Sequence, residues 1–233
     1  MIVELLLTSA LIGGAGQFQE RVDPARSGVQ PAQLVDGAAP ELPIAMLAGG
    51  QVFLELVIDL EGRVAGVKVL RASPSLTTVV TTAVASWRFE PSRTTVETVT
   101  QSLRFSVASS RIGRVFVGAI FHPPTAGAST LGREPSEGDP ADPETPFPTT
   151  IAMPSFPTSA FGGGIVLTEV HVESDGTVSD VCVLGSAPPF DGAALEAARK
   201  FRFRPAVVAG KAVPAYAYLL FGFPAPITGE LER

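Results

Sequence analysis

The string KFRFRPA occupies Lys200–Ala206 near the end of the 233-residue chain, and a close relative, SWRFEPS, occupies Ser86–Ser92, 114 positions earlier. Each string places an aromatic residue, an arginine and a phenylalanine in a row, and a proline follows after one further residue. Neither string matches a known catalytic motif. Self-similarity at a fixed offset instead indicates an internal repeat.

The repeat extends far upstream of these two strings. At an offset of 114 the sequence aligns with itself without a gap from Pro40 to Pro91. The matched positions are mostly prolines, glycines and valines, including Pro40/Pro154, Gly49/Gly163, Val52/Val166, Glu55/Glu169, Gly62/Gly176, Val67/Val181 and Pro91/Pro205. We therefore predict a tandem duplication, with one domain over residues 40–121 and a second over residues 151–226.

Each copy begins with the pattern of a β-hairpin. In the first copy, QVFLELVID alternates apolar residues and is followed by the turn DLEGR and the returning strand RVAGVKVL. Gly62 and Gly176 stand where a hairpin loop needs a positive φ angle. The apolar spacing then slips, which predicts a β-bulge near Ala65–Gly66 and another near Ser179–Asp180.

A helix and a last strand complete each copy. Apolar residues at helical spacing follow Thr77 and Asp191, which we predict as the N-caps of the two helices. The last strands are predicted over residues 95–107 and 212–223, and Arg114–Phe121 is predicted as an extra strand that only the first copy has. The fold class is therefore α+β, with two tandem β-β-α-β domains, each a small antiparallel sheet with one helix on a face.

Three segments lie outside the predicted domains. Residues 1–16 are mostly apolar and end in small residues, which favours an export signal, with a cytosolic N-terminal strand or helix as the alternative. This apolar run is too short for an ordinary transmembrane helix. Residues 17–39 are predicted to be a low-order segment. Residues 122–150 are rich in Pro, Gly and acidic residues, which predicts an extended and mobile linker.

The composition excludes some classes of function. The formal net charge is −6 and only 17% of the residues are charged, so the chain lacks the positive surface that a nucleic-acid partner requires. The chain contains none of the common metal, nucleophile or phosphate-loop motifs, so we predict no catalytic residues, no cofactor and no metal site. A single cysteine, Cys182, rules out an internal disulfide.

The polar residues that recur in both copies have ordinary structural interpretations. Glu55 and Glu169 are expected on the solvated face of the first strand. Arg88 and Arg202 are expected to cap the helix C-terminal carbonyls or to lie over the sheet, and a role in partner binding is the alternative. His171 is expected to be a half-exposed strand residue rather than a metal ligand.

The order of these motifs resembles the C-terminal domain of TonB-family proteins. The resemblance rests on a proline pair, the glycine-rich entry to the first strand, the return strand GxVxxVxVL, the small helix and the string [WF]RF-P, over residues 40–107 and 154–223. It implies a periplasmic, non-enzymatic domain that engages a segment of an outer-membrane transporter by β-strand addition, in energy-dependent transport.

We expect the partner to pair with the last strand of the second copy, where an open sheet edge offers main-chain hydrogen bonds. The candidate residues are Val213, Ala215, Tyr216, Ala217, Tyr218 and Leu219, with Arg88 and Arg202 as possible additions.

The chain also departs from the family pattern, because a long N-terminal anchor and a Pro-Lys or Pro-Glu spacer are not found. Membrane contact is therefore expected only through the N-terminal segment, if it is not cleaved. The alternative hypothesis is a structural or regulatory envelope protein whose two domains pair with each other, or which forms a dimer, without a role in transport.

Overall fold

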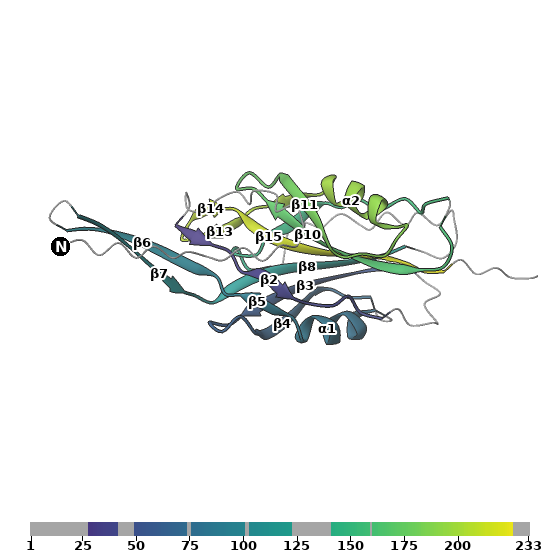
Figure 1. The fold of residues 1–233 in the computed structure, drawn as a ribbon, viewed down its shortest axis with the longest axis horizontal. Helices are drawn as coiled ribbons and strands as arrows, with labels where there is room; N and C mark the ends of the chain where they lie inside the picture. Colours follow the sequence, from purple (N-terminus) through teal and green to yellow (C-terminus); the bar gives the residue numbers. More distant parts are fainter. Residues whose placement is uncertain are drawn as a thin grey trace, which may run out of the picture.

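A single six-stranded sheet runs through the molecule and takes three strands from each half of the chain (Figure 1). The computed structural model describes residues 28–41, 49–73, 76–100, 103–122, 141–158 and 160–225. The sheet has the strand order β11-β10-β15-β8-β3-β4, in which only the central pair β15 and β8 is parallel. Its strands are β3 (Gly50–Ile58), β4 (Val64–Arg71), β8 (Gly113–Phe121), β10 (Gly164–Val172), β11 (Val178–Gly185) and β15 (Ala215–Phe223).

This shared sheet corrects the prediction of two separate small sheets, although the mixture of strands and two helices agrees with the α+β class. The helices α1 (Thr77–Ala85) and α2 (Asp191–Arg199) cover opposite faces of the sheet (Figure 1). Each face also carries buried side chains from the other half. Phe53 and Phe116 pack in the cluster under α2, and Leu167 and Leu220 pack in the cluster under α1. Both cores are therefore built jointly by the two halves.

The two halves repeat the same order of elements, and β8 is the last strand of the first half, as β15 is of the second. The elements β3, β4 and α1 start 114 residues before β10, β11 and α2, whereas β8 starts 102 residues before β15. A long hairpin, β6 (Arg93–Thr100) and β7 (Leu103–Ser110), replaces the short hairpin β13 (Ala206–Val208) and β14 (Lys211–Val213).

Two predictions about last strands are therefore wrong. The segment predicted as the last strand of the first copy belongs to the β6–β7 hairpin, and the supposed extra strand Arg114–Phe121 is the counterpart of β15. The predicted strand over residues 212–223 is divided between β14 and β15. The error arose because the longer hairpin carries its own strand pattern directly after the repeated string.

The segments outside the predicted domains are ordered where the structure describes them. The segment 17–39 contributes β1 (Val29–Gln30) and β2 (Gln33–Asp36), and the linker contributes β9 (Phe147–Thr150). β1 pairs with β6, β2 pairs with β5 (Arg88–Glu90), and β9 pairs with β12 (Arg202–Arg204). The composition of these segments predicted low order, but strands distant in sequence supply their hydrogen bonds. The predicted export signal, residues 1–16, lies outside the described residues.

Several local predictions are confirmed. Gly62 and Gly176 have φ angles of 80° and 84°, and a Cβ on either would overlap the carbonyl oxygen of Phe89 or Phe203. The predicted bulges are present, because Ala65 and Ser179 are the residues that the ladders skip.

The predicted N-caps are not found at Thr77 and Asp191, which are instead the first residues of the helices. Their side chains bond backward to the preceding turn. Thr77 Oγ1 accepts from the Ser73 N–H at 3.0 Å, and Asp191 Oδ1 accepts from the Ala187 N–H at 2.8 Å.

Candidate protein-binding site

The strand predicted to bind a partner lies at the centre of the sheet. Ala215, Tyr216, Ala217, Tyr218 and Leu219 belong to β15, which pairs with β10 on one side and with β8 on the other. Val213 lies in β14, which pairs with β13. The expectation of an open edge at this strand is therefore wrong in this fold. The parallel pairing with β8 joins strands about 100 residues apart in sequence, and no local pattern reveals it.

Tyr218 is buried where the two halves meet. Its hydroxyl donates to Glu169 Oε2 at 3.0 Å and accepts from the Leu34 N–H at 2.7 Å. The ring contacts Trp87 and Phe89 edge-on, with centroids 6.0 and 5.8 Å away. Burial, followed by the negative charge of Glu169, raises the pKa of Tyr218 well above the ordinary tyrosine value. Tyr218 is thus a core residue that joins the halves.

This raised pKa predicts a loss of stability at high pH. Below the ordinary tyrosine pKa of about 10 the hydroxyl is neutral in both the folded and unfolded states, so its contribution is fully present. Above that pH only the unfolded chain loses the proton, and the free energy of unfolding should fall by about 1.4 kcal/mol per pH unit. We expect denaturant titrations between pH 9 and 11 to show this fall. The same titrations on Tyr218→Phe should lack this component, and an unchanged slope would contradict the assignment.

Glu169 is buried with the Tyr218 hydroxyl, which corrects the expected solvated position. The residue is 6% exposed, and its Oε1 accepts from Gln33 Nε2 at 3.1 Å. Gln33 lies in β2, which pairs with β5 of the first half. The carboxylate therefore holds the leading segment of the first half against the sheet of the second half.

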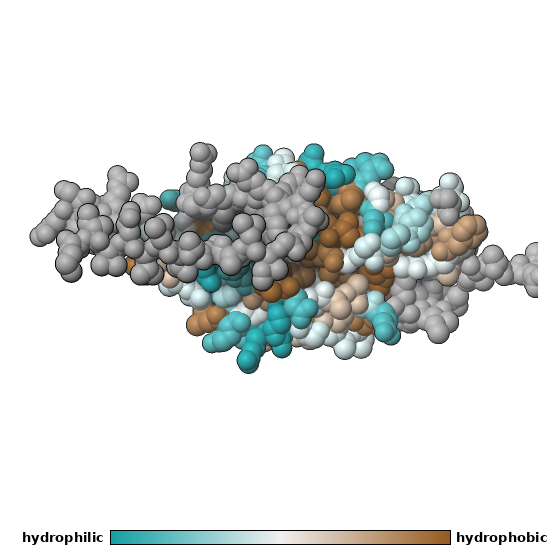
Figure 2. Space-filling model, in the orientation of Figure 1, coloured by the Kyte–Doolittle hydropathy of each residue, from teal (hydrophilic) through white to brown (hydrophobic). Residues whose placement is uncertain are grey.

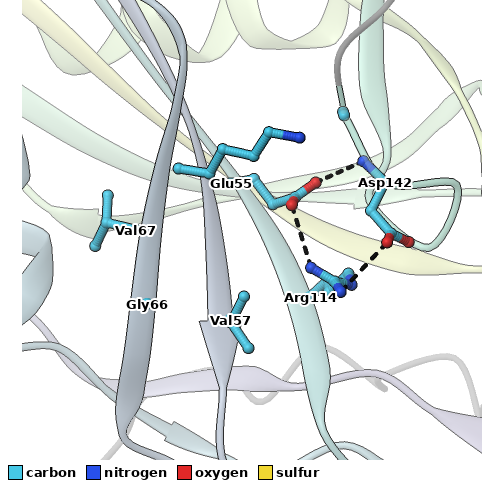
Figure 3. Close-up of a pocket in the computed structure, with 8 residues that line it drawn as sticks. Glu55, Val57, Gly66, Val67, Arg114 and Asp142 are labelled. Carbon is cyan, nitrogen blue, oxygen red and sulfur yellow. Dashed lines mark hydrogen bonds and ion pairs between the residues drawn. The ribbon is translucent and has the colours of Figure 1, made fainter.

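Glu55, the counterpart of Glu169, makes the reciprocal connection (Figure 3). It is 2% exposed, and Arg114 Nη1 donates to its Oε1 at 3.2 Å. Its Oε2 accepts from the Asp142 N–H at 2.7 Å and from Thr145 Oγ1 at 2.8 Å. Residues 142–145 lead into β9, so here the leading segment of the second half is held against the sheet of the first.

The burial of these two carboxylates had one signal in the sequence. The strands GQVFLELVI and GIVLTEVHV carry apolar residues on both faces, which is typical of a strand buried on both sides. A glutamate within such a strand must find hydrogen-bond donors. The identity of the donors could not be predicted, because they come from segments outside the aligned repeat.

A hollow of about 420 Å³ lies beside Glu55. Figure 3 shows the Glu55 and Asp142 carboxylates converging on the Arg114 guanidinium, which is 3.3 Å from Asp142. The hollow is lined by Glu55, Val57, Gly66, Val67, Lys68, Arg114, Ala141 and Asp142. Glu55, Arg114 and Asp142 bind one another across the two halves, so the arrangement serves to hold the chain together. Among the described residues, no group of three or more His, Cys, Asp or Glu side chains could hold a metal ion.

Arg88 and Arg202 have the structural contacts expected from the sequence. Arg88 Nη1 donates to the carbonyls of Ser86 and Trp87 at 3.2 and 3.0 Å. Arg202 Nη1 donates to the carbonyls of Arg199 and Phe201 at 3.4 and 2.7 Å. Both side chains therefore bind carbonyls at the C-terminal end of a helix, which leaves a role in partner binding as an untested prediction.

His171 binds its own strand neighbours. Its Nδ1 lies 2.8 Å from Ser179 Oγ and 3.4 Å from Glu173 Oε1. The ring also contacts the ring of Tyr216, with centroids 5.3 Å apart. These contacts join the bulge of β11 to β10 and β15, and they use the imidazole in a structural role.

The six-stranded sheet is open to strand pairing at its two outer edges. Within the described residues, β4 and β11 end the strand order, and each pairs on one side only. Both edges expose an apolar residue, because Val69 is 43% and Leu184 is 44% exposed. Apolar residues also reach the surface in the middle of the molecule, between hydrophilic regions (Figure 2). An extended partner segment can therefore meet main-chain and apolar groups together at these edges.

Comparison with known proteins identifies the family of the chain. No curated protein matches the sequence at a significant level. The sequence model of the Gram-negative bacterial TonB protein C-terminal family matches residues 40–108 and 162–223, which together exceed half of the 233 residues. The matched ranges contain β3, β4 and α1 of the first half and β10, β11, α2 and β15 of the second. The chain therefore belongs to the TonB C-terminal family.

Proposed function

We propose that the protein is a non-enzymatic, periplasmic protein-binding module of the cell envelope, which engages a segment of an outer-membrane transporter by β-strand addition in energy-dependent transport. The observation that carries the proposal is the family match in both halves of the chain. Strand addition suits such a module because main-chain hydrogen bonds supply affinity and alternate side chains supply selectivity. None of the helices in the described part of the chain has the length and apolar character needed to cross a membrane.

The arrangement of the sheet favours an outer edge as the place of strand addition. The last strands β8 and β15 are bonded to each other and to β3 and β10, so a partner cannot join them without breaking the sheet. Within the described residues of this sheet, β4 and β11 each pair on one side only, so a further strand can be added there without breaking the sheet. The partner residues predicted on β15 would then act by supporting the sheet.

A crosslinking pull-down from envelope fractions tests this function. The full chain should enrich an outer-membrane transporter relative to an unrelated exported bait of similar net charge. The matched bait is needed because the chain carries a formal charge of −6 and will retain basic proteins non-specifically. If envelope proteins are captured but no transporter is among them, the transport part of the proposal fails and protein binding remains.

A second candidate function is favoured by the central pairing of β8 with β15. In this alternative the two halves serve mainly as partners for each other, and the protein has a structural or regulatory role in the envelope without transport. Deletion of the gene separates the candidates. Loss of transporter-dependent uptake with an intact envelope supports the transport role, and increased detergent sensitivity with normal uptake supports the structural role.

We also infer that the two halves arose by tandem duplication. The same 114-residue offset relates β2 to β9, β3 to β10, β4 to β11, α1 to α2 and β5 to β12. The buried glutamates Glu55 and Glu169 and the positive-φ glycines Gly62 and Gly176 obey the same offset. Such agreement in both sequence and structure supports an origin from one ancestral unit.

A further inference from the structure

The two outer edges of the sheet have the same backbone but different side chains. In β4 the ladder skips Ala65 and Leu70, and in β11 it skips the counterparts Ser179 and Leu184. Between the two bulges, each edge offers a short regular stretch for pairing. The availability of each edge therefore depends on the residues it carries.

The β4 edge carries two basic side chains. Lys68 lines the hollow beside Glu55. The Arg71 guanidinium lies 4.7 Å from the centre of the Phe53 ring, and its Nη1 donates to Gln51 Oε1. Lysine and other charged residues on an edge strand are a common protection against the addition of another strand. We therefore expect β4 to be the less receptive edge.

The β11 edge carries no basic side chain. Its sequence, VSDVCVLG, contains no lysine or arginine, and its one charged residue is Asp180. Cys182 and Leu184 are exposed. The Val181 N–H donates to Asp180 Oδ1 at 2.9 Å, so this N–H points away from β10 and an added strand must take the place of the Asp180 carboxylate there. Because backbone groups alternate along a strand, the Val183 N–H lies on the same outward side.

The stretch of sequence that contains β11 is acidic. From Glu173 to Ala198 the sequence has five acidic residues and no lysine or arginine, whereas the corresponding stretch of the first half, residues 59–84, has two acidic and three basic residues. Glu196 is paired with Lys200 at 2.6 Å. The other four acidic residues of the stretch are Glu173, Asp175, Asp180 and Asp191. Hydrogen bonds from Thr177 and then the charge of Arg202 lower the pKa of Asp175, so Arg202 partly balances that carboxylate. The remaining negative charge of Glu173, Asp180 and Asp191 favours a positively charged partner.

We propose that β11 binds an extended, basic segment of a partner protein, which adds as a further strand along Asp180–Val183. This proposal rests on the protein-binding function proposed above. Val181 and Val183 pack toward the core under α2, and Cys182 lies on the other face, where its Sγ is 3.9 Å from Glu169 Oε1. The bound segment therefore alternates apolar residues beside the valines with basic residues on the face of Asp180.

Two short peptides, tested on the intact protein, separate the contribution of main-chain pairing from the preference for a basic partner. The probe is a labelled peptide of alternating valine and lysine, and its match is a peptide of alternating valine and glutamate. The lysine peptide should bind more tightly, and its affinity should fall as salt increases. Methylation of alternate backbone nitrogens of the lysine peptide should abolish its binding, because the charge is kept while the main-chain hydrogen bonds are lost.

Matched proline substitutions locate the site on the protein. Val183→Pro removes the outward N–H of β11 and should weaken binding of the lysine peptide about tenfold or more. Val69→Pro makes the corresponding change on β4 and should leave binding unchanged. Asp180→Asn should weaken binding of the lysine peptide about threefold. Trp87 fluorescence and the denaturation midpoint verify that each variant is folded.

Three results would overturn the proposal: equal binding of the lysine and glutamate peptides, binding that survives peptide methylation, or equal effects of the two prolines in folded variants. Self-association that Val183→Pro abolishes, without peptide binding, would assign β11 to a second copy of the chain instead. In the envelope pull-down, a folded Val183→Pro variant that still enriches the transporter would place binding elsewhere and preserve the proposed function. Peptide binding at β11 without any transporter enrichment would support the β11 site and contradict the proposed role in transport.

Discussion

Expressed separately, residues 28–122 and 141–225 are expected to remain largely unfolded, and on mixing they are expected to assemble into one folded complex. Each half alone would lose the partner of its last strand, because β8 and β15 pair with each other at the centre of the sheet. Each core would also lose apolar side chains that the other half supplies, such as Phe116 under α2 and Leu220 under α1. A domain of this size buries so little apolar surface that the loss of these contacts is enough to unfold it.

The crossing segments strengthen this dependence between the halves. Tyr218 and Glu169 of the second half bind Leu34 and Gln33 of the first, and Glu55 of the first half binds residues 142–145. The separated first half would therefore leave Glu55 without two of its three donors, and the separated second half would leave Glu169 without Gln33. Each unsatisfied group costs about 1–3 kcal/mol.

Far-UV circular dichroism and cooperative denaturation can follow both the fragments and their mixture, with the continuous chain as the control. Trp87, the one tryptophan of the chain, reports on the first half. Cooperative unfolding of either fragment alone, with a midpoint near that of the whole chain, would show that the halves are independent domains.

The sequence predicted the local structure of this protein well. Spacing and residue type over short stretches of sequence predicted the turn glycines Gly62 and Gly176, the bulges at Ala65 and Ser179, and both helices. The aromatic residues of the repeated string, Trp87, Phe89, Phe201 and Phe203, are all buried. These features depend on neighbours in the chain, so a single sequence contains the information needed to predict them.

Long-range pairing was not accessible from the sequence in the same way. Residues far apart in the chain form the β8–β15 pairing and the pairings of β2 and β9. The residues that bury Glu55 and Glu169 are likewise distant in sequence. A strand predicted as an edge can become central when a second copy of the same unit supplies its partner. For this reason the binding residues predicted on β15 fell at the join between the halves, and the open edges lie at the opposite sides of the sheet.

Replacement of Glu55 by alanine is expected to lower the free energy of unfolding by about 3 kcal/mol, because it leaves three donors without their acceptor. These donors are Arg114 Nη1, the Asp142 N–H and Thr145 Oγ1. Arg114 keeps its ion pair with Asp142 at 3.3 Å, which limits the loss. Glu55→Gln keeps one carbonyl acceptor but no charge, and should cost about half as much.

Urea denaturation followed through Trp87 measures these changes. Glu61→Ala is the matched control, since Glu61 lies in the exposed turn after the same strand and should change stability by less than about 0.5 kcal/mol. A double-mutant cycle between Glu55→Ala and Thr145→Ala should show a coupling of about 1 kcal/mol, because the second change adds little once the acceptor is gone. Additive effects of the two substitutions would mean that Glu55 does not hold the leading segment of the second half.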